Sequence, residues 1–114
     1  MITQYTAASI VSQNKQLCTP SSVDSIVSSN GQEDHVSMGA NSAIKLHKVV
    51  NNVNTLLSIE LMNSVQALEL KKIKSSKIII KLVNSYREKV PFVNQDVILS
   101  NYIFKGKEFI SNYF

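Results

Sequence analysis

The sequence contains few of the residues that build disulfide frameworks, phosphate-binding loops and aromatic cores. Among 114 residues there are one cysteine, Cys18, three isolated glycines and no tryptophan. A single cysteine excludes an intrachain disulfide, and isolated glycines exclude a glycine-rich phosphate loop. Because only 7% of the residues are aromatic, a core has to be built from isoleucine, leucine and valine. The cysteine content is compatible with a reducing compartment.

Long apolar runs are also absent. The longest strongly apolar run, Ile78-Ile79-Ile80, ends at Lys81, far short of the roughly 20 residues that span a bilayer. The first six residues contain neither the basic segment nor the apolar segment of a signal peptide. We therefore expect no membrane-spanning segment and no signal peptide.

Positive charge is concentrated in one stretch. The chain carries a formal net charge of +4, and residues 71–89 contain seven lysines and arginines against Glu88 alone. Such a stretch can bind nucleic acid or an anionic surface. The same pattern is also typical of a solvated helix face, and we favour that interpretation over a binding surface.

Apolar spacing predicts helices in the first two thirds of the chain. Residues 1–17 carry apolar side chains at helical spacing, and Pro20 ends this pattern. Residues 18–35 are rich in serine, asparagine and glycine, which favour turns. Residues 36–73 form a long predicted helix, with Gly39 as the alternative first residue. This helix is apolar on more than one face, which is typical of a helix buried among several others. We expect it to pack against helices that this short chain does not supply.

The last third, residues 74–114, is predicted to hold shorter helices. Ser75 and Ser76 interrupt the long helix, and Pro91 marks another break. The β-branched run 78–83 suits a strand or a helix, and we favour a helix because no other segment resembles a pairing strand. A last helix is expected over 98–110, with Gly106 as a weak point. The fold class predicted is all-α, with long antiparallel helices.

One polar cluster has the composition of a chemical site. Gln32, Glu33, Asp34 and His35 place two carboxylates beside an imidazole, which suits acid–base chemistry. A metal site is not supported, because His47 and Cys18 lack ligand spacing relative to this cluster. The alternative is structural, since acidic groups before a helix cap its amides and complement its dipole.

Several segments resemble the aromatic amino-acid ammonia-lyase family, especially its histidine-specific branch. The most specific is residues 32–39, Gln-Glu-Asp-His-Val-Ser-Met-Gly. Others are residues 1–8, 20–26, 59–61 with 66–68, 90–92 and 96–99, in the family's order and spacing. The resemblance implies that the chain corresponds to the C-terminal part of such an enzyme, a fragment of the ammonia-lyase helical bundle.

The resemblance implies elimination of ammonia from an aromatic amino acid, with histidine giving urocanate. The family's electrophile is a methylidene-imidazolone made from Ala-Ser-Gly, and here Ala8-Ser9 is followed by Ile10. The isolated chain is therefore expected to be inactive. The family also implies a cytoplasmic homotetramer whose active sites combine residues from several subunits, with an amino-acid substrate and with neither nucleic acid nor a membrane as partner.

The resemblance also assigns roles to four residues. Glu33 matches the family's active-site glutamate, and Gln32 matches a neighbouring polar residue that orders the site. Met1 and Tyr5 match pocket positions on the preceding helix, one turn apart. The family often has Ala-Asn before Gln-Glu, where this chain has Asn30-Gly31, so tyrosine and phenylalanine remain alternative substrates. The alternative from another class is a small helical interaction protein that uses the basic stretch 71–89.

Overall fold

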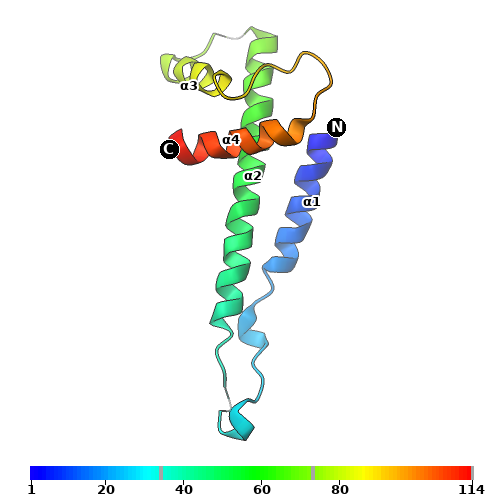
Figure 1. The fold of residues 1–114 in the computed structure, drawn as a ribbon, viewed down its shortest axis with the longest axis vertical. Helices are drawn as coiled ribbons and strands as arrows, with labels where there is room; N and C mark the ends of the chain where they lie inside the picture. The colour runs from blue at the N-terminus through cyan, green and yellow to red at the C-terminus, as the bar shows by residue number, and fades with distance from the viewer. Residues whose placement is uncertain (34, 73, 114) are drawn as a thin grey trace.

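The computed structural model describes residues 1–33, 35–72 and 74–113, and within them the regular structure is entirely helical (Figure 1). Four α-helices follow one another: α1 (Ile2–Leu17), α2 (Gly39–Lys71), α3 (Lys77–Arg87) and α4 (Leu99–Tyr113). Two short 3-10 helices, η1 (Ser21–Val23) and η2 (Ser29–Gly31), lie between α1 and α2. The predicted all-α class is confirmed, and the ambiguous run 78–83 is helical, as expected.

Helices α1 and α2 form a long antiparallel hairpin (Figure 1). Polar side chains join them, because Asn52 Nδ2 donates to Gln13 Oε1 at 2.8 Å and to Asn14 Oδ1 at 2.7 Å. Lys45 Nζ donates to the Thr19 carbonyl at 2.8 Å, just after α1 ends. No residue of α1 is buried, so the packing of α1 against α2 contains no apolar core of its own.

The long helix begins at the later of its two predicted starts. Its first residue is Gly39 rather than residue 36, and Met38 is its N-cap without a side-chain hydrogen bond. It ends at Lys71, and Ile73, where the predicted helix stopped, lies outside the described residues. Among the described residues, no helix combines the length and apolar character needed to cross a membrane.

The core lies where α3 and α4 meet the second half of α2. It consists of Met62, Val65, Tyr86, Val90 and Phe109. The rings of Tyr86 and Phe109 meet edge to face, with centroids 5.3 Å apart and planes at 84°. Helix α4 crosses α2 instead of running antiparallel to it (Figure 1). The antiparallel arrangement expected for the long helices is thus seen in α1 and α2.

Gly106, predicted as a weak point of the last helix, does not interrupt that helix and is a close-packing residue. It is buried inside the unbroken helix α4. A Cβ built on Gly106 would lie 2.3 Å from Ser58 Oγ, which itself donates to the Ile103 carbonyl at 2.7 Å. Only a residue without a side chain permits α2 and α4 to cross this closely.

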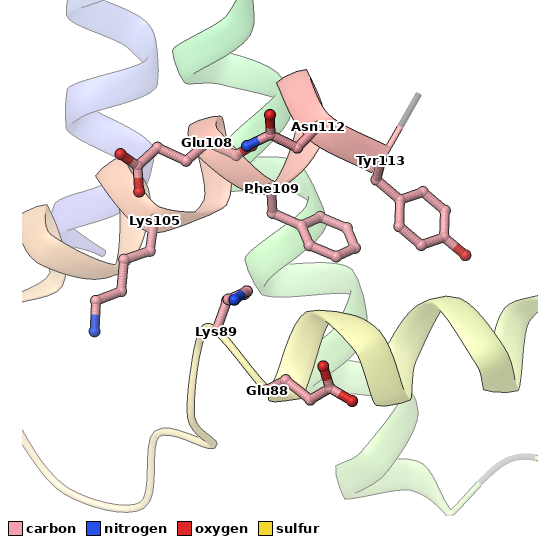
Figure 2. Close-up of a pocket in the computed structure, with 7 residues that line it drawn as sticks. All are labelled: Glu88, Lys89, Lys105, Glu108, Phe109, Asn112 and Tyr113. Atoms are coloured by element: carbon pink, nitrogen blue, oxygen red, sulfur yellow. The ribbon is translucent and has the colours of Figure 1, made fainter.

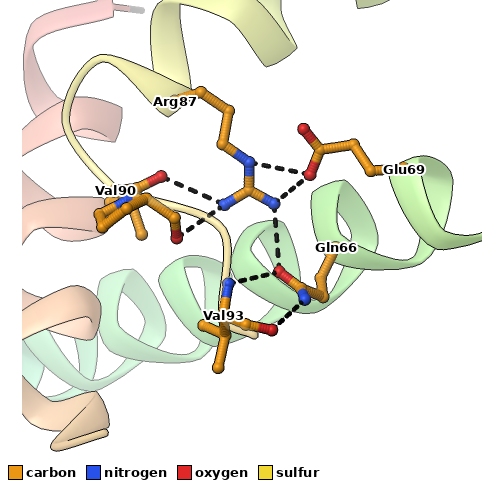
Figure 3. A network of polar contacts seen from close by, with 6 residues as sticks. Gln66, Glu69, Arg87, Val90 and Val93 are labelled. Atoms are coloured by element: carbon orange, nitrogen blue, oxygen red, sulfur yellow. Dashed lines mark hydrogen bonds and ion pairs between the residues drawn. The ribbon is translucent and has the colours of Figure 1, made fainter. Parts of the chain in front are cut away.

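Arg87 joins α3 to the end of α2 and to the segment after α3 (Figure 3). Its guanidinium forms an ion pair with Glu69 and donates through Nη1 to the carbonyls of Val90 and Pro91, each at 3.1 Å. Gln66 completes the arrangement: its Oε1 accepts from Arg87 Nη2, and its Nε2 donates to the Val93 carbonyl at 2.7 Å. One member of the basic stretch is therefore a structural residue.

The molecule is extended. Its principal extents are 67 × 28 × 20 Å and its radius of gyration is 20.0 Å, whereas a compact domain of about 100 residues has a radius of gyration of about 13 Å. The 18–38 connection lies at one end of the long axis, and α3 and α4 lie towards the other (Figure 1).

Candidate functional site

The loop that carries Gln32 and Glu33 is closed by a tight turn. An isolated antiparallel bridge joins Ser28 to Glu33, and three successive residues between them have positive φ: Ser29 (52°), Asn30 (59°) and Gly31 (83°). Positive φ is uncommon for residues other than glycine, and asparagine tolerates it better than most. The turn holds Gln32 and Glu33 exposed at the far end of the hairpin.

Ser25 links the two sides of this loop through its hydroxyl group. Its Oγ accepts a hydrogen bond from the Val36 amide at 3.2 Å and lies 3.1 Å from His35 Nδ1. Which of the two atoms donates to the other depends on the tautomer of His35. Asp34, the fourth member of the predicted cluster, lies outside the described residues.

An open cavity of about 440 Å³ lies next to the contacts that Ser25 makes with His35 and Val36. Serine hydroxyls, His35 and the start of α2 surround it; its lining residues are Ser21, Ser22, Ser25, His35, Val36, Ser37, Met38, Gly39 and Ser42. Neither Gln32 nor Glu33 lines it. The involvement of Ser25 is something that sequence reasoning missed, because its partners stand 10 and 11 residues away.

The structural alternative for Glu33, a helix-capping role, is wrong. Helix α2 begins six positions after Glu33, its N-cap is Met38, and its first turn contains no acidic residue. The Glu33 carboxylate is therefore too far along the chain to cap the first amides of α2, which an N-cap side chain reaches from the adjacent position.

Met1 and Tyr5 lie at the opposite end of α1 from this loop (Figure 1). Both are exposed, Met1 by 90% and Tyr5 by 68%. Because α1 has 16 residues, it separates its ends by about 24 Å, and the connection to Glu33 adds further distance. One chain therefore does not bring the four predicted site residues together: Gln32 and Glu33 share one end, and Met1 and Tyr5 share the other.

No cluster of three or more histidine, cysteine or acidic side chains suited to a metal exists in the part of the chain that the structure describes. His47 Nε2 instead lies 3.0 Å from Asn51 Nδ2, its neighbour on the next turn of α2.

A second cavity, of about 480 Å³, lies between the end of α3 and α4 (Figure 2). Phe109 contributes an apolar surface, and the remaining lining side chains are polar or charged, apart from the ring of Tyr113: Glu88, Lys89, Lys105, Glu108 and Asn112. It is remote in sequence from the Gln32–Glu33 loop, and sequence reasoning gave no sign of it.

The class of protein follows from comparing this fold, with its hairpin, its crossed helix α4 and the loop before α2, with solved structures. A crystal structure of histidine ammonia-lyase from Trypanosoma cruzi matches 91% of this chain with a TM-score of 0.85 and 36% identity. A crystal structure of an ergothioneine-degrading enzyme, ergothionase from Treponema denticola, matches 95% of it with a TM-score of 0.85 and 31% identity. The fold is that of helical lyases of this kind.

The family follows from the sequence comparisons. The family profile described as aromatic amino acid lyase matches residues 1–88, and a histidine ammonia-lyase from Treponema denticola is 47% identical over 98% of the chain. The chain belongs to the aromatic amino acid lyase family. This decides against the alternative of an unrelated small basic helical protein. The chain spans 22% of the length of that relative, and 21% and 22% of the two solved structures.

Proposed function

We propose that this chain provides the Gln32–Glu33 loop of a histidine ammonia-lyase, a cytoplasmic enzyme that eliminates ammonia from histidine to give urocanate. The observation that carries the proposal is the 47% identity with a histidine ammonia-lyase along almost the whole chain. The ergothionase match, with the same TM-score as the histidine enzyme, favours a second candidate, a lyase acting on ergothioneine. Tyrosine and phenylalanine remain further alternatives for the substrate.

Glu33 is proposed as the catalytic residue of this loop. A carboxylate can hold the ammonium group of an amino acid through charge-assisted hydrogen bonds and can exchange a proton with it as ammonia leaves. The tight turn after Ser28 fixes the backbone on which Glu33 stands. Gln32, beside it, offers an amide that donates and accepts hydrogen bonds, which suits ordering of the substrate.

The cofactor of the proposed enzyme does not fit any segment of this chain. Ala8 and Ser9 lie inside the regular helix α1 and are followed by Ile10, so they do not supply the Ala-Ser-Gly that forms a methylidene-imidazolone. In the proposal, the electrophile comes from a part of the enzyme outside this chain. The chain's own residues bind and orient the amino acid and exchange its protons.

The separation of the predicted residues supports a site shared between subunits. Met1 and Tyr5 stand a full helix length or more from Gln32 and Glu33 within one chain. A site that contains all four residues therefore requires at least two copies, and the homotetramer implied by the resemblance would provide them. Each copy would contribute the Glu33 end of its hairpin to one site and the Tyr5 end to another.

The proposal is tested by the change Glu33→Gln, made at the matching position of a full-length histidine ammonia-lyase. The substitution preserves shape and removes the charge. If Glu33 exchanges protons, turnover of histidine, followed as urocanate absorbance, falls by about 10²-fold or more, while the melting temperature stays unchanged.

The matched control is Glu88→Gln, which removes a carboxylate from an exposed position at the end of α3, outside both the loop and α2. It should leave turnover near that of the parent enzyme. Normal turnover in the Glu33→Gln enzyme would remove Glu33 from the site.

A further inference from the structure

Five lysines surround the junction between α2 and α3. We call Lys71, Lys72, Lys74, Lys77 and Lys81 the lysine surface, and all five are exposed. No aspartate or glutamate occurs between Glu69 and Glu88. The junction lies at the end of the molecule opposite the Gln32–Glu33 loop (Figure 1), so the proposed chemistry does not use it.

Within the described residues, no acidic side chain neutralises the lysine surface. Glu69, the nearest acidic residue, accepts from Arg87 through both Nε and Nη2 (Figure 3). None of the five lysine side chains has an ion pair or a hydrogen bond with the part of the chain that the structure describes. Their charge is therefore available to an anionic partner.

Two of the lysines stand where they oppose local stability. Lys72 is the C-cap of α2 and has a φ of 51°, a left-handed conformation that glycine adopts at lower cost. Lys77 is the first residue of α3, where the positive end of the helix dipole disfavours a cation. The positive charge of Lys77 therefore does not stabilise α3, and an external anionic partner is the simpler reason for it.

Apolar side chains accompany the lysines. Leu70 is 66% exposed, and Ile78 and Ile80 are 78% and 48% exposed. On α3, Ile78 and Ile80 lie on either side of the strip formed by Lys77 and Lys81, at the angles that a 3.6-residue period dictates. Lysines with exposed aliphatic neighbours are typical of helices that bind the interface of an anionic bilayer.

Other partners fit less well. Binding of single-stranded nucleic acid relies on aromatic rings and arginine for stacking, but residues 70–84 contain neither, and Arg87 is occupied by Glu69. Two lysine surfaces facing each other in a dimer would repel. Lysine is a compact point charge that needs no fixed bidentate geometry, which suits a diffuse layer of lipid phosphates.

We propose that the lysine surface and its flanking aliphatic side chains, Leu70, Ile78 and Ile80, bind the surface of a membrane that contains anionic phospholipids. Binding is peripheral: the lysines contact the headgroups, and Ile78 and Leu70 enter the boundary between headgroups and acyl chains. The proposal is independent of the activity of the family.

The experiment is vesicle flotation of the purified chain. We expect it to float with vesicles of phosphatidylcholine and phosphatidylserine, to remain behind with pure phosphatidylcholine, and to be released by salt. The double change Lys77→Gln/Lys81→Gln should weaken binding by about 25-fold, since one lysine near an anionic surface contributes about fivefold. Ile78→Ser should weaken it as well, in a way that salt does not alter.

The matched control is Lys15→Gln/Lys48→Gln, which removes the same charge from exposed positions outside the lysine surface and should bind vesicles like the parent chain. Equal loss in both double variants would show that net charge alone attracts the chain and would overturn the proposal. So would equal flotation with pure phosphatidylcholine, or tighter binding to an oligonucleotide than to the anionic vesicles.

Discussion

At the scale of single residues, the close approach of Gly106 to Ser58 leads to a specific prediction about packing. Gly106→Ala should lower the free energy of unfolding by about 1 kcal/mol, because overpacking costs about 1–3 kcal/mol while the better helix former returns about 1. Relief requires Ser58 to rotate, which breaks its 2.7 Å bond to the Ile103 carbonyl. Urea unfolding followed by circular dichroism measures the change.

A second substitution isolates this contact. Ser58→Ala removes the Oγ that a Cβ at position 106 would meet at 2.3 Å and leaves the Ser58 Cβ at 3.4 Å and the Tyr86 hydroxyl oxygen at 3.5 Å, both ordinary contact distances. In that background Gly106→Ala should be neutral or stabilising. If the two substitutions were simply additive, the proposed clash between positions 58 and 106 would be excluded.

Tyr86 is the residue whose ionisation links stability to alkaline pH. Its ring is fully buried, and its hydroxyl has no hydrogen-bond partner within the described part of the chain. Burial raises the pKa of Tyr86 from 10.0 to about 12, and the nearby Arg87 partly opposes the rise. The folded state therefore retains the proton between these two values after the unfolded state has lost it.

The expected consequence is a loss of stability as pH rises from 10 to 12, by at most about 1.4 kcal/mol per pH unit. Below pH 10 this contribution is fully present. Tyr86→Phe keeps the ring contact with Phe109 and should abolish this part of the pH dependence, with unchanged or higher stability at pH 8. Parallel urea titrations at pH 8 and pH 11 compare the two proteins. An identical alkaline loss in both would exclude Tyr86 as its source.

At the scale of elements, the end of α2 offers a paired test. Lys72→Gly should raise the free energy of unfolding by about 0.5–1 kcal/mol, because glycine adopts the left-handed C-cap conformation without the penalty of a side chain. The neighbouring Lys71→Gly removes the same charge inside the helix and should cost about 1 kcal/mol. Thermal unfolding of the two variants gives opposite shifts; shifts of the same sign would contradict the left-handed cap.

The helices themselves could be predicted from local pattern. Apolar spacing indicated α1, α2 and α4, whereas α3 was favoured over a strand because no other segment resembles a pairing strand. The breaks at Pro20, Ser75 and Pro91 fell between helices. Local pattern left the start of α2 between Val36 and Gly39, because Val36 and Met38 continue the apolar pattern although Ser25 holds the Val36 amide in the loop. A contact across 11 residues leaves no trace in local periodicity.

The packing role of Gly106 could not be predicted for a related reason. A glycine inside a helix pattern lowers helix propensity wherever it occurs, and only its distance to Ser58, 48 positions earlier, shows that the fold needs it. The candidate site divides in the same way. The string around Glu33 predicted Gln32 and Glu33 as site residues, whereas their separation from Met1 and Tyr5 emerged only from the hairpin geometry.

At the scale of the whole molecule, the chain exposes far more surface than a compact protein of its mass. Its accessible surface is 8609 Å², against about 6,200 Å² for a compact monomer of 12.7 kDa. The excess, about 2,400 Å², exceeds the roughly 800 Å² that each partner buries in a standard interface and falls in the range of obligate ones. Much of it is apolar, including Ile44, Leu46, Val50, Val53 and Leu57 along α2.

Such a surface should make the isolated chain self-associate, because apolar patches of this size drive association in water. Sedimentation velocity at micromolar concentration should show species larger than the monomer. Leu46→Glu/Val50→Glu places two charges on exposed apolar positions one turn apart and should shift the distribution towards the monomer. The control Asn63→Glu/Ala67→Glu adds the same charges at exposed positions of α2 with the same spacing and should leave it unchanged. A stable monomer of the parent chain would contradict the prediction, because the extended hairpin would then persist in water with its apolar faces exposed.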